Sequence, residues 1–114
     1  MRIGSDIQER DILTQVREAA AKRSLFLPHA INQMNSPDRM ISTEEIRAVV
    51  FNVVLVEDYP EDMRGHSCLM LGWGTGDRPL HVVCAPKVGY LAIITTYLPR
   101  STQWEPDWQT RRKG

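Results

Sequence analysis

The apolar residues near the start of the chain recur with helical spacing. They stand three to four positions apart, while charged residues occupy the other faces of the segment. The positions that share this spacing are Ile12, Leu13, Val16, Ala19 and Ala20. Upstream, Ser5 and Gln8 have the three-residue separation of a capping box, which pairs the first free amides of a helix. The pattern predicts an amphipathic helix from about residue 6 to residue 23.

Two shorter helices are predicted next. Pro28 suits the first turn of a helix, and this helix ends before Ser36-Pro37 because the residue preceding a proline disfavours helical backbone. A third helix begins after Ser42, which forms a second capping box with Glu45. Asn52 is a suitable left-handed stop for it.

From residue 53 onward the pattern is typical of β-strands. Four runs are rich in apolar and β-branched residues: Val53–Val56, Ser67–Trp73, Leu80–Ala85 and Tyr90–Leu98. An acidic loop over residues 57–62 follows the first run, and short turn sequences at residues 74–79 and 86–89 join the others. Short loops connect antiparallel neighbours, so the strands are expected to form a meander.

The elements together predict an α+β fold in which N-terminal helices pack on a four-stranded antiparallel sheet. The 114 residues suit one domain, numbered 1–114. The hydrophobic fraction of 42% and the charged fraction of 25% are those of an ordinary globular protein rather than a disordered chain.

Membrane and secretory segments are not expected. No apolar run approaches the roughly 20 residues of a membrane-spanning helix. The first residues run directly into a charged segment without the apolar centre of a signal peptide. We therefore expect a cytoplasmic protein that makes no membrane contact.

The two cysteines are expected to be free thiols. If a hairpin turns about Gly76, then Cys68 and Cys84 lie opposite each other in apolar strand sequence. A reducing compartment keeps such a pair reduced, so we expect thiols in the core. The sequence contains no CxxC motif and no His/Cys cluster, and we expect neither a metal nor a cofactor.

Charge is unevenly distributed, although the formal net charge is zero. Residues 1–63 contain seven basic and eleven acidic side chains, a net charge of −4. Residues 64–114 contain seven basic and three acidic side chains, a net charge of +4. A basic sheet half is a weak indication of an anionic partner.

Few residues indicate chemistry by themselves, because phosphate-binding, nucleophile-elbow and zinc-binding motifs are missing. His81, inside a strand run, is either a satisfied sheet-face residue or an acid–base group poised near neutral pH. His29 either binds an anion or completes a polar turn, and Tyr97 is a common strand residue.

The C-terminal segment combines aromatic and basic residues. Trp104 and Trp108 stand four residues apart, which predicts one helix face covering the sheet. Arg111, Arg112 and Lys113 could hold a phosphate, but we interpret them as a solvated, frayed end.

The order of several short motifs resembles a bacterial family, the domain of unknown function numbered 4258. The resemblance spans about residues 27–108. The matching pieces are Pro28-His29-Ala30, Arg39-Met40-Ile41-Ser42, Glu57-Asp58-Tyr59-Pro60, Leu69-Met70-Leu71-Gly72, Arg78-Pro79-Leu80-His81-Val82-Val83, Ile93-Ile94-Thr95-Thr96-Tyr97 and Trp104.

The family is similar to small toxins of the barnase/RelE-like fold, which are often encoded beside an antitoxin. The resemblance implies a sheet whose open face receives RNA, and RNA cleavage without a metal. It implies His81 as general base or acid, Arg39 on the phosphate, and Tyr97 or His29 as supporting donors. The expected partners are an RNA substrate and an antitoxin protein.

The chain also departs from this family. Gln33 stands where an arginine is common, which removes one charge from the implied phosphate site, and Leu27 replaces a capping hydroxyl. Two alternatives therefore remain open. One is a protein-interaction module of the same fold without catalysis, and the other is a regulatory domain that binds a small ligand between helices and sheet.

Overall fold

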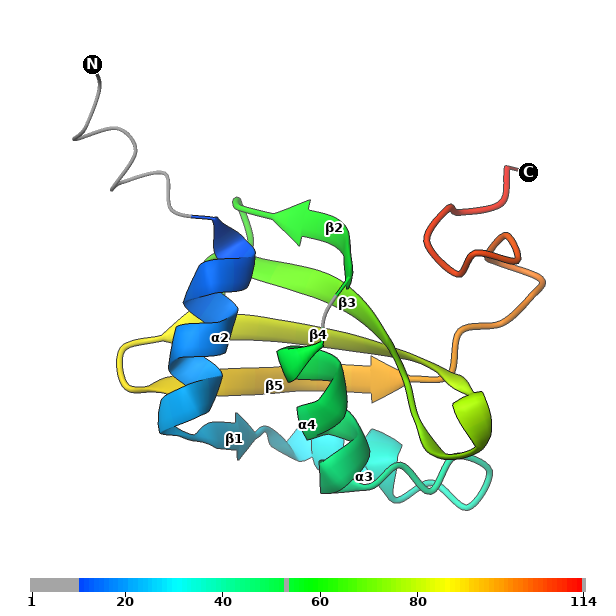
Figure 1. The fold of residues 1–114 in the computed structure, drawn as a ribbon, viewed down its shortest axis with the longest axis horizontal. Coiled ribbons are helices and arrows are strands. Elements are labelled where there is room, and N and C mark those ends of the chain that lie inside the picture. The colour runs from blue at the N-terminus through cyan, green and yellow to red at the C-terminus, as the bar shows by residue number, and fades with distance from the viewer. Residues whose placement is uncertain (1–10, 53, 114) are drawn as a thin grey trace.

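One mixed sheet organises the structure. The computed structural model describes residues 11–52 and 54–113. Their elements run in the order α2 (Ile12–Lys22), β1 (Ser24–Phe26), α3 (Pro28–Met34), α4 (Thr43–Phe51), β2 (Val54–Tyr59), β3 (Ser67–Trp73), a 3₁₀ turn (Thr75–Asp77), β4 (Pro79–Lys87) and β5 (Tyr90–Tyr97) (Figure 1). The five strands in these residues are ordered β1-β5-β4-β3-β2.

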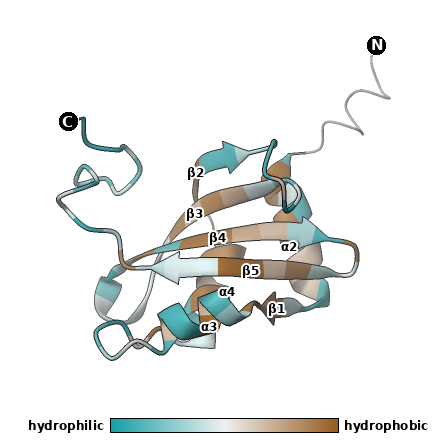
Figure 2. Ribbon diagram, turned by 180° about the vertical axis from the view of Figure 1, so that it is seen from behind, coloured by the Kyte–Doolittle hydropathy of each residue, from teal (hydrophilic) through white to brown (hydrophobic). Residues whose placement is uncertain are grey.

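Helices α2 and α4 cover one face of the sheet, and α3 packs against β5 (Figure 1). The strands bury alternate side chains against these helices, because successive strand residues point to opposite faces. In β4 the residues of this core are Leu80, Val82 and Cys84. His81, which lies between two of them, therefore belongs to the other face, which is turned toward the viewer in Figure 2. The predicted α+β class is confirmed.

Helix α2 does not have the boundary that the sequence predicts. The Asp11 side chain accepts a hydrogen bond of 3.2 Å from the amide of Leu13, and Asp11 itself has non-helical backbone. Helix α2 consequently begins at Ile12, so a helix running without interruption from residue 6 is wrong. The predicted capping box at Ser5 and Gln8 lies outside the described residues.

The other two predicted helices are confirmed, but the expected left-handed stop at Asn52 is wrong, because this residue has a φ of −123°. Helix α3 opens with Pro28 and ends at Met34. Ser42 and Glu45 form the reciprocal capping box: the Ser42 hydroxyl accepts from the Glu45 amide at 3.1 Å, and the Glu45 carboxylate accepts from the Ser42 amide at 3.0 Å.

The predicted four-stranded antiparallel sheet is wrong in two respects. A fifth strand, β1, pairs in parallel with β5, so the sheet is mixed. A strand of three residues is too short to show the alternation of buried and exposed side chains that marks a strand in the sequence. The position of β1 is set instead by its pairing with β5. In addition, β2 continues through Glu57 and Asp58 to Tyr59, positions expected in a loop, because pairing with β3 outweighs their low strand propensity. The pairs β2–β3, β3–β4 and β4–β5 are antiparallel, as predicted.

The cysteine prediction is confirmed. Cys68 and Cys84 are register partners in the hairpin of β3 and β4, and both are buried free thiols. The neighbouring Cys68 and burial raise the pKa of the Cys84 thiol, so this group stays protonated. The helices among the described residues include none that is both long and apolar enough to span a membrane.

Candidate functional site

Three of the four residues implied in the chemistry line one open pocket. The pocket has a volume of about 330 Å³ and lies where α3, the loop after it, the end of β5 and the following segment meet. His29, Arg39 and Tyr97 contribute to it from these separate elements. The remaining lining residues are Gln33, Thr95, Leu98, Arg100 and Gln103.

The pocket lining is cationic. It contains two arginines, Arg39 and Arg100, and no carboxylate. Asp38 lies nearby, and its pKa is lowered chiefly by a hydrogen bond from Ser36, with smaller contributions from both arginines. Asp38 is therefore ionised and within electrostatic range of the two guanidinium groups, and it offsets part of their charge.

Arg78 fixes the backbone that carries Arg39. Its Nη1 donates to the carbonyl oxygen of Arg39 at 2.7 Å, and its Nη2 donates to the carbonyl oxygen of Met40 at 3.0 Å. Met40 has a φ of 49°, a left-handed conformation that a non-glycine residue rarely adopts. Two donors from one guanidinium therefore hold the loop in a conformation that its own sequence disfavours.

Glu45 in turn holds Arg78. The carboxylate accepts from Arg78 Nε at 3.1 Å and from Nη2 at 3.0 Å, and from the amide of Thr75 at 2.7 Å. Only 7% of Glu45 is exposed. Burial raises the pKa of this carboxyl, but hydrogen bonds from Arg78, Ser42 and Thr75 outweigh it and lower the pKa to about 2. The network joins α4, the turn between β3 and β4, and the Arg39 loop.

His81 lies behind Tyr97 and is fully buried. Its Nε2 is 2.7 Å from the carbonyl oxygen of Trp108, and its Nδ1 is 3.2 Å from the hydroxyl oxygen of Tyr97. A carbonyl only accepts, so Nε2 carries the proton and Nδ1 accepts from the Tyr97 hydroxyl. Burial lowers the pKa of His81, which is therefore neutral at pH 7. Of the two interpretations that the sequence leaves open for His81, the buried ring with both nitrogens hydrogen-bonded is that of the satisfied sheet residue.

The segment of residues 99–113, here called the C-terminal tail, covers His81. Trp104, only 2% exposed, meets the imidazole edge-on with ring centroids 4.6 Å apart and an interplanar angle of 89°. The indole covers the sheet as expected, but through turns rather than a helix, and Trp108 has a left-handed φ of 60°. The predicted helix face shared by the two tryptophans is wrong.

Arg111 anchors this tail to the sheet. It donates to the Glu57 carboxylate from Nε at 2.7 Å and from Nη2 at 3.0 Å, and its guanidinium lies 4.6 Å from the Trp104 ring centroid. The Arg111 hydrogen bonds lower the pKa of Glu57, so the pair is ionic at neutral pH. Arg111 was interpreted as part of a frayed end, and this interpretation is wrong.

Sequence reasoning missed the parts of this site that only the fold assembles. Arg100, Gln103 and Thr95 enter the pocket because β5 and the tail run beside α3. Glu57 was placed in a loop, and its separation from Arg111 in sequence offered no signal of their contact. Arg78 belongs to a motif noted in the sequence, but nothing there indicated its two carbonyl partners.

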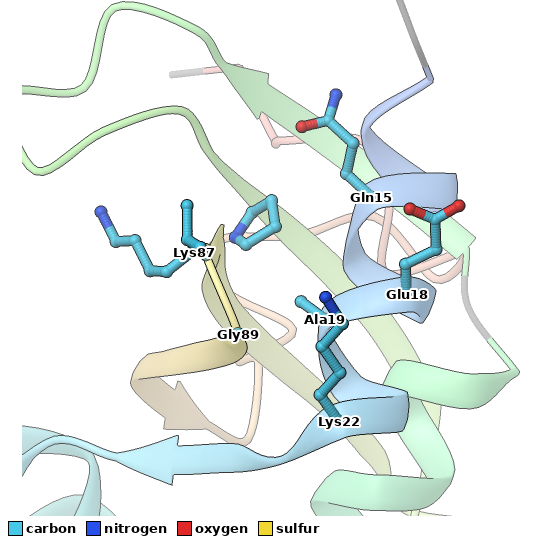
Figure 3. Close-up of a pocket in the computed structure, with 8 residues that line it drawn as sticks. Gln15, Glu18, Ala19, Lys22, Lys87 and Gly89 are labelled. Atoms are coloured by element: carbon cyan, nitrogen blue, oxygen red, sulfur yellow. The ribbon is translucent and has the colours of Figure 1, made fainter.

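A second, larger pocket lies away from these residues. Its volume is about 520 Å³. Gln15, Glu18, Ala19 and Lys22 on α2 line one side of it, and Lys87 at the end of β4 and Gly89 in the following turn line the other (Figure 3). It is the kind of concavity that a ligand-binding regulatory domain requires. None of the residues implied in RNA chemistry lines it, so we place the candidate site at the cationic pocket.

Comparison with known proteins gives a family match. The family model described as Domain of unknown function (DUF4258) matches residues 26–98. The matched segment contains His29, Arg39, His81 and Tyr97, and it ends where the C-terminal tail begins. Comparison with curated proteins gives no match, and comparison with solved structures gives none either.

Proposed function

The chain belongs to this family of unknown function, and we propose that it is a metal-independent ribonuclease, a toxin that a protein antitoxin neutralises. One observation carries the proposal. His29, Arg39 and Tyr97 come from three separate elements into one cationic pocket, and Tyr97 is hydrogen-bonded to His81 behind it. An imidazole beside two guanidinium groups is suited to phosphoryl transfer, in which charge develops on a phosphate and protons must move.

The proposed reaction assigns a role to each group. Arg39 binds the phosphate and stabilises the charge of the phosphorane. His29 accepts the proton of the ribose 2′-hydroxyl, whose oxygen attacks phosphorus as the bond to the 5′-oxygen breaks. The neutral, buried His81 of this structure is not an acid, so the proposed reaction requires His81 to be exposed and protonated before it protonates the leaving 5′-oxygen. The products are a 2′,3′-cyclic phosphate and a 5′-hydroxyl. Burial raises the pKa of Tyr97, so this residue stays a phenol and acts as a donor.

The test is cleavage of a defined RNA oligonucleotide in the presence of EDTA. The wild-type chain is expected to cleave it to products with 2′,3′-cyclic ends and to leave unchanged an oligonucleotide with a single 2′-deoxy residue at the cleaved position. Growth arrest on expression, relieved by His29→Asn, is the expected cellular result. A chain that neither cleaves RNA nor arrests growth overturns the proposal.

A protein-interaction module without catalysis is the second candidate. The observation that favours it is the state of His81, whose two ring nitrogens are both engaged within the protein. An inactive chain that binds RNA or protein without cleaving RNA would support this candidate.

A further inference from the structure

The C-terminal tail is a loop unit that stabilises itself. The amide of Glu105 donates to the carbonyl of Thr110 at 2.8 Å, and the amide of Arg112 donates to the carbonyl of Gln103 at 2.9 Å. The Asp107 carboxylate closes the turn by accepting from the amides of Gln109 and Thr110 at 2.9 and 3.0 Å. These bonds remain intact if the tail moves away from the sheet as a body.

A small set of contacts joins this unit to the sheet. In the described part of the chain, these include the Arg111–Glu57 ion pair, the bond between the Trp108 carbonyl and His81, and the packing of Trp104 on the imidazole. All three converge on the surface around His81. The side chain of Glu57 is 27% exposed, so water can solvate it when the ion pair opens.

The position of the tail conflicts with the role proposed for His81. As long as the Trp108 carbonyl holds the Nε2 proton, His81 has no free nitrogen to offer a leaving oxygen. The family match ends at Leu98, so the segment that covers His81 lies outside the matched domain.

From these contacts we propose that the C-terminal tail is an autoinhibitory strap, which closes over His81 and must lift before the chain engages RNA. The inference rests on the proposed function, since it regulates the same site. Lifting the strap breaks the bond to Trp108, exposes the imidazole to solvent, and presents His81 and Tyr97 on one surface with His29 and Arg39, which lie outside the strap. The apparent affinity for RNA is then the intrinsic affinity reduced by the fraction of molecules with the strap open.

Two single variants of the full chain separate the strap from general charge effects. Arg111→Gln removes the ion pair with Glu57, whereas the control Arg112→Gln removes the same charge one position away. The Arg112 side chain donates within the tail, to the Ser101 carbonyl and to the Glu105 carboxylate. Thermal melting curves should show that both variants are folded.

The first measurement detects opening of the strap in the absence of RNA. Diethyl pyrocarbonate labels accessible imidazoles, and mass spectrometry identifies the labelled residue. In the wild type and in Arg112→Gln, His81 should remain protected while the exposed His29 reacts. In Arg111→Gln, His81 should react at least about tenfold faster, in proportion to the open fraction. Protection of His81 in Arg111→Gln equal to that in the control overturns the proposal.

The second measurement is binding of a 2′-O-methyl RNA oligonucleotide, which cannot be cleaved, followed by fluorescence anisotropy. Arg111→Gln should bind about tenfold more tightly than Arg112→Gln at the same ionic strength. Equal or weaker binding overturns the strap, since a merely structural tail predicts a loss. If this difference appears but no variant cleaves ordinary RNA, the ribonuclease proposal fails and the strap stands. No binding by any variant overturns both.

Discussion

Nε2 of His81 lies 2.7 Å from the carbonyl oxygen of Trp108, and this hydrogen bond joins the middle of the sheet to the C-terminal tail. The contact gives His81 a structural role in the closed form in addition to any chemical one. A substitution at this position therefore changes both stability and activity, and the two effects need separate measurements.

His81→Ala is expected to destabilise the protein. The substitution leaves a cavity beneath Trp104 and removes the partner of the Trp108 carbonyl. Together these losses should lower the free energy of unfolding by about 2–4 kcal/mol. Urea denaturation measures it. Tolerance within 0.5 kcal/mol would mean that the imidazole is not packed as the structure has it, and His81→Gln is the better variant for activity assays.

His81 should also make stability depend on pH. Burial lowers its pKa in the folded state, so the unfolded chain, with a pKa of about 6.5, takes up a proton first as the pH falls. Stability is therefore greatest above about pH 6.5 and declines as the pH falls toward the folded pKa. The difference in unfolding free energy between wild type and His81→Gln, measured from pH 8 to pH 5, should shrink over this range. If this difference in unfolding free energy does not change with pH, the pKa of His81 is not lowered in the folded state.

Glu45 should also make stability depend on pH, but at lower pH than His81. Its folded pKa of about 2 lies below the ordinary value of 4.5, so the stabilisation is present above pH 4.5 and is lost as the pH falls toward 2. Glu45→Gln should cost about 2–3 kcal/mol at pH 7 and progressively less below pH 4.5. Glu44→Gln is the matched control, because Glu44 is its exposed neighbour. Equal losses in both variants would contradict a special role for the bonds between Glu45 and Arg78.

The sequence predicts those features of the structure that depend on residues close together in the chain. The capping box of Ser42 and Glu45 is local, and it was located to the residue. The pairing of Cys68 with Cys84 followed from a single hairpin centre. By contrast, strand β1 has three residues and exists because β5 offers it hydrogen bonds.

The candidate site likewise depends on contacts between residues that are distant in the sequence. Glu57 meets Arg111 only because β2 extends beside β3 and the tail returns across the sheet. Neither residue has a local feature that distinguishes it from a solvated charge. The residues taken from the family resemblance do come together around Tyr97, but the burial of His81 depends on a tail that no short motif describes.

Gly72→Ala should test the packing of α4 on β3. A Cβ atom at Gly72 would lie 2.5 Å from Cγ2 of Val49 and 3.0 Å from its Cα, which belongs to the helix backbone. Helix α4 must therefore shift, at a cost of about 1–3 kcal/mol in unfolding free energy. The control is Gly76→Asn, because Gly76 has no atom within 4 Å of a built Cβ and asparagine tolerates its φ of 68°. A Gly72 variant as stable as the control would show that the helix approaches the strand less closely.

Arg39→Gln should weaken RNA binding in a way that identifies a phosphate contact. A side chain that neutralises one phosphate releases about 0.7 of a counterion from a single strand, so its removal lowers the slope of log affinity against log salt by about that amount. Arg39 lines the cationic pocket, whereas Arg47 is exposed on α4 and serves as the control with the same charge change.

The oligonucleotide is again the 2′-O-methyl RNA, with anisotropy measured from 50 to 300 mM salt in the Arg111→Gln background, where the strap is expected to be open. Both variants lose one positive charge, so a general electrostatic effect shifts them equally. Only a phosphate held in the pocket makes the Arg39 slope shallower than the Arg47 slope. Identical slopes would remove Arg39 from the RNA site and leave the pocket without its proposed ligand.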